Sequence, residues 1–150
     1  MIKEDILHFL RHGQLAHVKM GMSLKEVEHL LGQNPGWKVP ISRKDKRPSL
    51  IKYDQTEFYF GHEEIQALYG IQITYSQPAS SQKLLMDYRE LVKAPARNGL
   101  KDFLTSYKIP FQEKTSPYDP LDQIFALETD ILFFFDEDGK LQKFGRFLQV

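Results

Sequence analysis

Apolar residues recur at helical spacing in two places near the start of the chain, and both are interpreted as amphipathic helices. The first covers residues 2–12, and the second begins at Ser23 and ends at Gly32. Ser23 and Glu26 have the spacing of a capping box, in which each side chain accepts a hydrogen bond from the other residue's backbone amide. Gly32 is expected to end this helix in the left-handed conformation.

Runs of β-branched and aromatic residues after the second helix predict two groups of antiparallel strands. The alternation is clearest in residues 67–75, where every second residue is a large apolar one. Asp138-Gly139, between the last two runs, predicts a tight hairpin turn. The expected strands are residues 50–54, 56–60, 67–75, 111–115, 123–127, 131–135 and 141–148.

The order of a helix and then a meander occurs twice along the chain. A helix capped by Asn98 precedes the second group of strands, and its apolar stripe repeats that of the helix at Ser23. We therefore predict an α+β fold of two similar units, each with one or two helices and a meander of three or four strands, with the helices packed on one sheet face. The units are residues 1–76 and 97–150, and residues 77–96 are a linker, an additional helix or an outlying strand. One α+β domain without a repeat is the alternative.

The composition excludes several classes of site. The 150 residues include no cysteine, so a disulfide framework, a thiolate zinc site and a cysteine nucleophile are excluded. Lys and Arg together number 20, as do Asp and Glu, so no net field recruits nucleic acid or a membrane surface. The first twelve residues do not resemble a signal peptide, and no apolar run is long enough to span a membrane. We expect a cytoplasmic protein.

The run from Gly21 to Gly32, Gly-Met-Ser-Leu-Lys-Glu-Val followed by Leu-Leu-Gly, is followed by a basic loop with prolines and by an aromatic strand. This arrangement resembles the BamE/SmpA family of outer-membrane lipoproteins. It is also similar to small bacterial proteins of the immunity type. The resemblance implies a helix-helix-meander fold shared with the β-lactamase inhibitor protein, which looks like a tandem of two such units. The chain lacks the lipid-modified cysteine and the inhibitor's disulfides, so what carries over is a fold with a sheet that grips a protein partner.

His8 and His12 are the main candidates for a metal site, because residues four apart on a helix lie on the same face. A catalytic zinc helix would place an acid directly after the first histidine, where this chain has Phe9. A solvated histidine pair is therefore the favoured interpretation. We expect no cofactor, and enzymatic activity is not favoured.

Residues 131–135 are apolar on both faces of the expected strand, although a sheet with helices on one side needs only one apolar face. Either the second face is also covered, or it displays aromatic side chains to a partner. A basic loop at residues 38–47 could add charged contacts. The candidate partner-binding residues are Trp37, Arg43, Lys44, Arg47, Tyr53, Tyr59, Tyr69 and Phe133.

The sequence thus favours a non-enzymatic protein-binding module, of the inhibitor or immunity kind, that uses an open aromatic sheet face. Its expected partner is another protein, and neither nucleic acid nor a membrane. Two alternatives stay open. One is an enzyme or metal-binding protein that uses His8 and His12, and the other is a homodimer in which the exposed sheet pairs with a second copy.

Overall fold

Strands predominate in the computed structural model, which describes residues 2–32, 38–75, 83–91 and 95–148. Three helices occur within these residues: α1 (Ile6–His12), α2 (Leu24–Leu31) and α3 (Arg97–Ser106). The strands are β1 (Ile2–Asp5), β2 (Lys38–Pro40), β3 (Pro48–Tyr53), β4 (Thr56–Phe60), β5 (Leu68–Thr74), β6 (Leu84–Asp87), β7 (Phe111–Thr115), β8 (Gln123–Leu127), β9 (Ile131–Phe135) and β10 (Leu141–Phe147).

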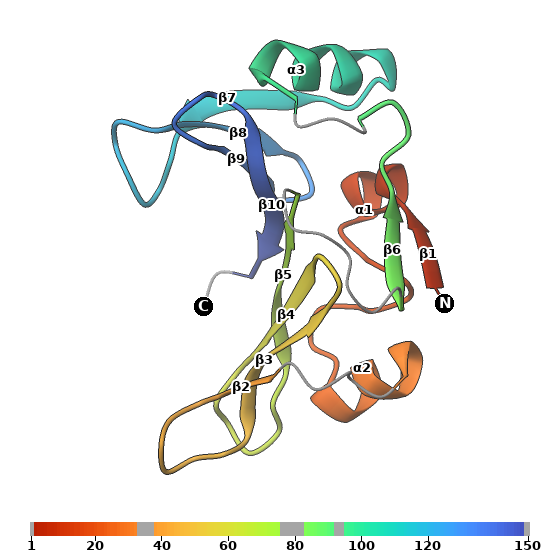
Figure 1. The fold of residues 1–150 in the computed structure, drawn as a ribbon, viewed down its shortest axis with the longest axis vertical. Helices are drawn as coiled ribbons and strands as arrows, with labels where there is room; N and C mark the ends of the chain where they lie inside the picture. Colours follow the sequence, from red (N-terminus) through yellow and green to blue (C-terminus); the bar gives the residue numbers. More distant parts are fainter. Residues whose placement is uncertain (1, 33–37, 76–82, 92–94, 149–150) are drawn as a thin grey trace.

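Eight of the strands form one antiparallel sheet in the order β2-β3-β4-β5-β10-β9-β8-β7 (Figure 1). The central contact joins β5 to β10, which are far apart in the sequence. The other two strands, β1 and β6, form a separate parallel ribbon. Every strand predicted from the sequence is confirmed, with bounds that differ by at most two residues.

The predicted fold class is wrong. The protein is mostly β and has one large sheet, and it does not consist of two similar helix-plus-meander units. One physical reason is the β1–β6 ribbon. Residues 84–87 lie between the two expected units in the sequence, but they pair with residues 2–5 at the N-terminus. Similar apolar spacing in two helices reports only that each helix has one buried face, and it does not require a repeat.

The start of the chain is the second correction. Residues 2–5 were expected to open a helix, but they form β1, and α1 begins only at Ile6. Asp5 is the N-cap of α1, where its Oδ1 accepts a hydrogen bond of 3.0 Å from the Leu7 amide. The Arg89 guanidinium forms an ion pair of 2.5 Å with the same carboxylate. Because Arg89 follows β6, this ion pair links the two strands of the ribbon just beyond their last backbone pair.

The helix and turn signals are confirmed in part. The capping box at Ser23 and Glu26 has both of its hydrogen bonds, and Gly139 adopts φ +75° in the hairpin turn between β9 and β10. Gly32 has φ +87° but ψ 172°, so it does not form the predicted left-handed helical cap. Asn98 does not cap α3, because the N-cap of that helix is Ala96, two residues earlier.

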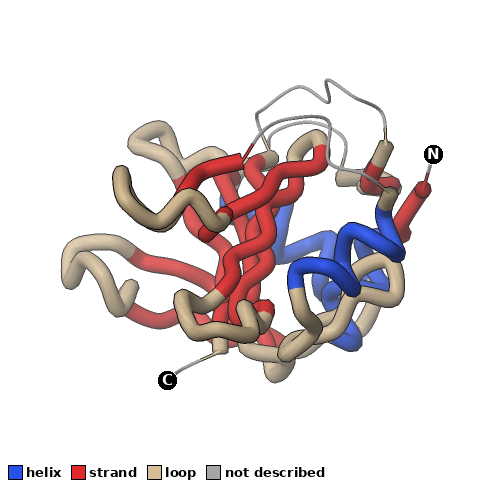
Figure 2. The backbone as a smooth tube through the Cα atoms, turned by 90° about the horizontal axis from the view of Figure 1, so that it is seen from below, coloured by secondary structure: helices blue, strands red, loops and turns tan. Residues whose placement is uncertain are grey.

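All three helices lie on the same side of the sheet (Figure 2). Alternate residues of β4 and β9 are buried there, and the residues between them are only half-buried. Two contacts attach the end of α1 to the sheet: Thr129 Oγ1 donates to the Leu10 carbonyl at 3.0 Å, and Arg146 donates to the Gly13 carbonyl at 3.2 Å. The largest fully buried side chains of this core are Tyr53, Phe9, Phe58, Phe60, Phe125, Phe133 and Phe144.

The ion pair at the ribbon predicts a dependence of stability on pH. The hydrogen bond from Arg89 is the main reason why the pKa of Asp5 lies below its ordinary value. A carboxylate whose pKa is lower in the folded state stabilises the fold above its unfolded pKa, and this stabilisation is lost as the pH falls through the folded pKa. Asp5→Asn keeps the capping oxygen and removes the charge. We expect its deficit in the free energy of unfolding, measured with urea, to shrink as the pH falls from about 6 to about 2. A deficit that stays constant over this range would contradict the assignment.

Candidate functional site

The face of the sheet opposite the helices, called here the open face, carries an aromatic cluster. Tyr59, Tyr69 and Phe147 come from the neighbouring strands β4, β5 and β10. Their ring centroids lie 5.2 to 6.3 Å apart. These side chains alternate with buried residues of the core and are half-buried themselves. The apolar surface of the sheet therefore continues on the side opposite the three described helices.

Beside this cluster, small residues make a hollow in the open face. The strand registers place five residues in one row that crosses the sheet from β5 to β7: Gln72, Gly145, Leu132, Ala126 and Gln112. Gly145 has no side chain, and Ala126 has only a methyl group. Larger side chains stand two residues away along the strands, on either side of the row. The sheet surface is consequently lower along the row than beside it.

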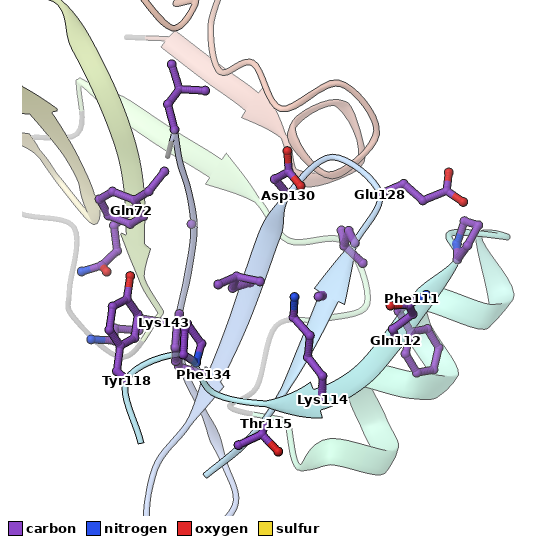
Figure 3. Close-up of a pocket in the computed structure, with 18 residues that line it drawn as sticks. Gln72, Phe111, Gln112, Lys114, Thr115, Tyr118, Glu128, Asp130, Phe134 and Lys143 are labelled. Carbon is purple, nitrogen blue, oxygen red and sulfur yellow. The ribbon is translucent and has the colours of Figure 1, made fainter. Parts of the chain in front are cut away.

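This hollow is an open groove of about 1200 Å³, bounded on two sides by different charges (Figure 3). On one side lie Lys143, Phe134 and Lys114, which we call the lysine wall. On the other side lie Glu128 and Asp130, which we call the acidic wall. Phe147 and Leu148 also line the groove, so the aromatic cluster continues into it.

The loop of residues 116–122 extends over the lysine wall. Ser116 is buried at its base, and the Ser116 Oγ accepts a hydrogen bond of 3.1 Å from the Tyr118 amide. The Tyr118 ring centroid lies 6.0 Å from that of Phe134, yet Tyr118 is 77% exposed and Leu121 is 91% exposed. This loop thus presents two large apolar side chains to solvent, and one of them, Tyr118, lines the groove.

The charges in the groove have no ion-pair partner among the described residues. The Lys143 ammonium lies 5.4 Å from the centroid of the Phe134 ring, which is a cation–π contact. In the aromatic cluster, burial and a hydrogen bond to Glu57 raise the pKa of Tyr59, so this phenol stays neutral. The lysine and acidic walls are therefore available to charges on a bound molecule.

Of the aromatic residues predicted from the sequence, two lie on the open face and two do not. Tyr59 and Tyr69 belong to the aromatic cluster. Tyr53 and Phe133 are fully buried on the covered face, so their predicted contact with a partner is corrected. The Tyr53 hydroxyl donates to the Gly32 carbonyl at 2.7 Å, and burial raises the pKa of this phenol to about 12. Trp37 lies outside the described residues.

The predicted basic residues lie in and beside the turn between β2 and β3, far from the groove (Figure 1). Arg43 and Lys44 are exposed there. Arg47 contributes to structure, because its guanidinium binds Asp45 and donates to the carbonyls of His62 and Glu63 at 3.0 and 2.9 Å. The structure therefore does not bring these cations together with the aromatic cluster in one site.

The histidine pair lies on the surface of α1. The rings of His8 and His12 are 4.9 Å apart, and both residues are exposed. Within the described ranges, no group of three or more His, Cys, Asp and Glu residues could hold a metal ion. None of the helices in the same ranges is both long enough and apolar enough to cross a membrane.

Sequence reasoning missed several residues of the groove, chiefly Phe134, Lys143, Phe147 and Tyr118. A signal for Phe134 was present, because residues 131–135 are apolar on both faces. The others depend on which strands are neighbours in the sheet. The pairing of β5 with β10, which aligns Phe147 with Gly70, is not visible in the local pattern.

No protein-family model matches the sequence, and no curated protein matches it significantly. Among solved structures, the chain is similar to a DUF4309 family protein, YjgB, from Bacillus subtilis. The sequence identity is 11%, the match covers 85% of this chain and 78% of that chain, and the TM-score is 0.46. A likeness at this level carries no argument about function. The resemblance to BamE/SmpA domains remains an expectation from the sequence.

Two glycine substitutions, one in the floor of the groove and one in α3, are expected to have opposite effects on stability. A Cβ at Gly145 would lie 2.5 Å from the carbonyl oxygen of Ile71, so Gly145→Ala should lower the free energy of unfolding by about 1–3 kcal/mol. At Gly99, in α3, the nearest atom would be the Pro95 Cβ at 3.4 Å, and Gly99→Ala should raise it by about 0.5 kcal/mol. Urea unfolding measures both. Equal effects at the two positions would contradict the close approach of β10 to β5.

Proposed function

We propose that this protein is a non-enzymatic protein-binding module, and that a partner protein binds to the open face of the eight-stranded sheet. One observation carries the proposal: a groove with an apolar floor and unpaired charges on its walls lies beside an aromatic cluster on the uncovered face. Inhibitors and immunity proteins act by binding a partner protein and do not catalyse a reaction. A role of this kind is part of what we propose.

The exposed apolar side chains favour a macromolecular partner. Large contiguous apolar patches on protein surfaces mark interaction sites. Here the half-buried cluster of Tyr59, Tyr69 and Phe147 continues into the groove through Phe147, and Tyr118 adds an exposed aromatic ring to its lining. Tyrosine side chains combine a large apolar area with a hydrogen-bonding hydroxyl, and they often contribute most of the affinity at interfaces.

The dimensions of the groove also support a protein partner over a small molecule. Small-molecule pockets typically measure about 300–1000 Å³ and enclose most of the ligand. This groove is larger, at about 1200 Å³, and it is open along the sheet surface. A segment of a partner protein could fill it while the aromatic cluster and the loop of residues 116–122 contact the surroundings of that segment.

The chemistry of the lining supports binding more than catalysis. The described residues that line the groove include no histidine, cysteine or serine. Its ionisable side chains are on opposite walls, with Lys114 and Lys143 on one side of the row of small residues and Glu128 and Asp130 on the other. Such an arrangement can orient a charged partner and raise its association rate.

Site-specific photo-crosslinking in cells of the source organism tests this proposal. A benzophenone amino acid replaces Tyr118, which lines the groove, or Leu121, which is exposed in the same rim loop. The matched controls carry it at Ile65, which is 74% exposed in the connection between β4 and β5, or at Lys25 on α2. We expect both rim positions, and neither control, to give an adduct with the same protein.

Adducts that form equally from the controls would contradict binding at the open face. An adduct with a second copy of this chain would replace the proposal with the homodimer interpretation. To confirm that each variant is folded, its unfolding transition in urea is compared with that of the wild-type protein.

A further inference from the structure

The separation of the two walls defines the width of what the groove can hold. Along β9 and the turn before it, the acidic wall at Asp130 and the lysine wall at Phe134 are four residues apart. At about 3.3 Å per residue, the walls stand about 13 Å apart. An α-helix with its side chains is about 10–12 Å wide, so a single helix fits between the backbones of the two walls.

The length of the floor agrees with a short helix. The row from Gly145 through Leu132 and Ala126 to Gln112 crosses β10, β9, β8 and β7. Four strands at about 4.8 Å give a floor of about 15 Å between the outer strands. This distance corresponds to about ten helical residues at 1.5 Å each, or nearly three turns.

The floor also has the character of a sheet surface that lies under a helix. Ala126 is buried, and Leu132 and Phe134 are half-buried, although none of the three helices in the described residues lies on this side (Figure 2). A strand with two apolar faces, as β9 has, is typical of sheets that are covered on both sides. The covered side has its own helices, and the open side lacks the corresponding layer.

The charges on the two walls indicate which charges the flanks of a bound helix would carry. Lys114 and Lys143 would lie along one flank, and Glu128 and Asp130 along the other. A helix with acidic residues on one flank and basic residues on the opposite flank would pair with both walls. A helix with the same charge on both flanks would be repelled by one of them.

From these four observations we infer that the groove binds an amphipathic helix of the partner protein. This helix lies across strands β7–β10 with its apolar stripe on the Gly145–Ala126 row, its acidic flank at the lysine wall and its basic flank at the acidic wall. Tyr118, whose ring lies beside Phe134 of the lysine wall, contacts the acidic flank of the helix. The inference rests on the proposed function, and it specifies the form of the bound segment.

Two peptide display libraries provide the test. In one, apolar residues are fixed at helical spacing over about fourteen residues and both flanks are randomised. In the other, the same composition has alternating spacing, as in a strand. Both libraries are selected on the full-length protein. We expect binders from the helical library, with acidic residues enriched on one flank and basic residues on the other.

Charge reversal then locates the selected helices. The double variant Lys114→Glu/Lys143→Glu should bind them about fivefold to tenfold more weakly and should select helices with basic residues on both flanks. The control Lys25→Glu/Lys46→Glu changes the net charge equally at exposed positions outside the groove, and it should bind as the wild type does. Fluorescence anisotropy with the selected peptides measures both.

Three results would overturn the inference. The first is binders from the alternating library alone, the second is helical binders that ignore the charge reversal, and the third is the absence of binders from both libraries. The first of these leaves the proposed function intact if rim-specific crosslinks to a partner are observed. Failure of the crosslinking experiment would instead remove the proposed function and this inference together.

Discussion

The pairing of β5 with β10 is the interaction on which the rest of the structure depends. It joins strands from the two halves of the chain into one sheet, with residues 143–147 opposite residues 70–74. Two glycines permit this close approach. A Cβ at Gly145 would collide with the backbone of β5, and a Cβ at Gly70 would lie 2.3 Å from the Phe147 ring. Phe147 therefore covers Gly70, an arrangement in which an aromatic ring shields an exposed glycine backbone.

This pairing also determines where the two faces of the sheet lie. It places Phe144 between Ile73 and Phe133 on the covered side, where the Phe133 and Phe144 rings stack with centroids 5.2 Å apart. By the same alternation, it places Gly145 between Gln72 and Leu132 on the open side. The core and the groove are thus two consequences of one register. A slip by one residue would exchange them.

Local patterns in the sequence were sufficient to predict seven of the eight strands of the large sheet. The exception is β2, a strand of three residues at the start of the segment that was expected to be a basic loop. Alternating burial requires alternating apolar residues, and the turn at Asp138-Gly139 is encoded by two adjacent residues. The β1–β6 ribbon escaped prediction because β1 is four residues long and its parallel partner starts at Leu84. The fold class was wrong for the same reason, since a one-dimensional pattern does not show which segments become neighbours in space.

The candidate site shows the same limit at the level of single residues. Alternation says that Tyr53 and Tyr59 point to opposite faces once the tight turn between β3 and β4 is counted, but it does not say which face the helices cover. The same holds for Phe133 and Phe134, of which the sequence analysis selected the buried one. The groove could not be predicted from the sequence, because its floor is a row of residues from strands that are distant in the sequence.

The open face is the central claim, and solvent paramagnetic relaxation in NMR tests it most directly. A soluble gadolinium chelate would be added to the protein, and the relaxation of assigned aromatic side chains would be compared. Tyr118, Phe134 and Phe147 should relax strongly, while Phe133 and Phe144, which are fully buried on the other face, should be protected. Equal protection of Phe134 and Phe133 would mean that the face is already covered, and it would contradict this account.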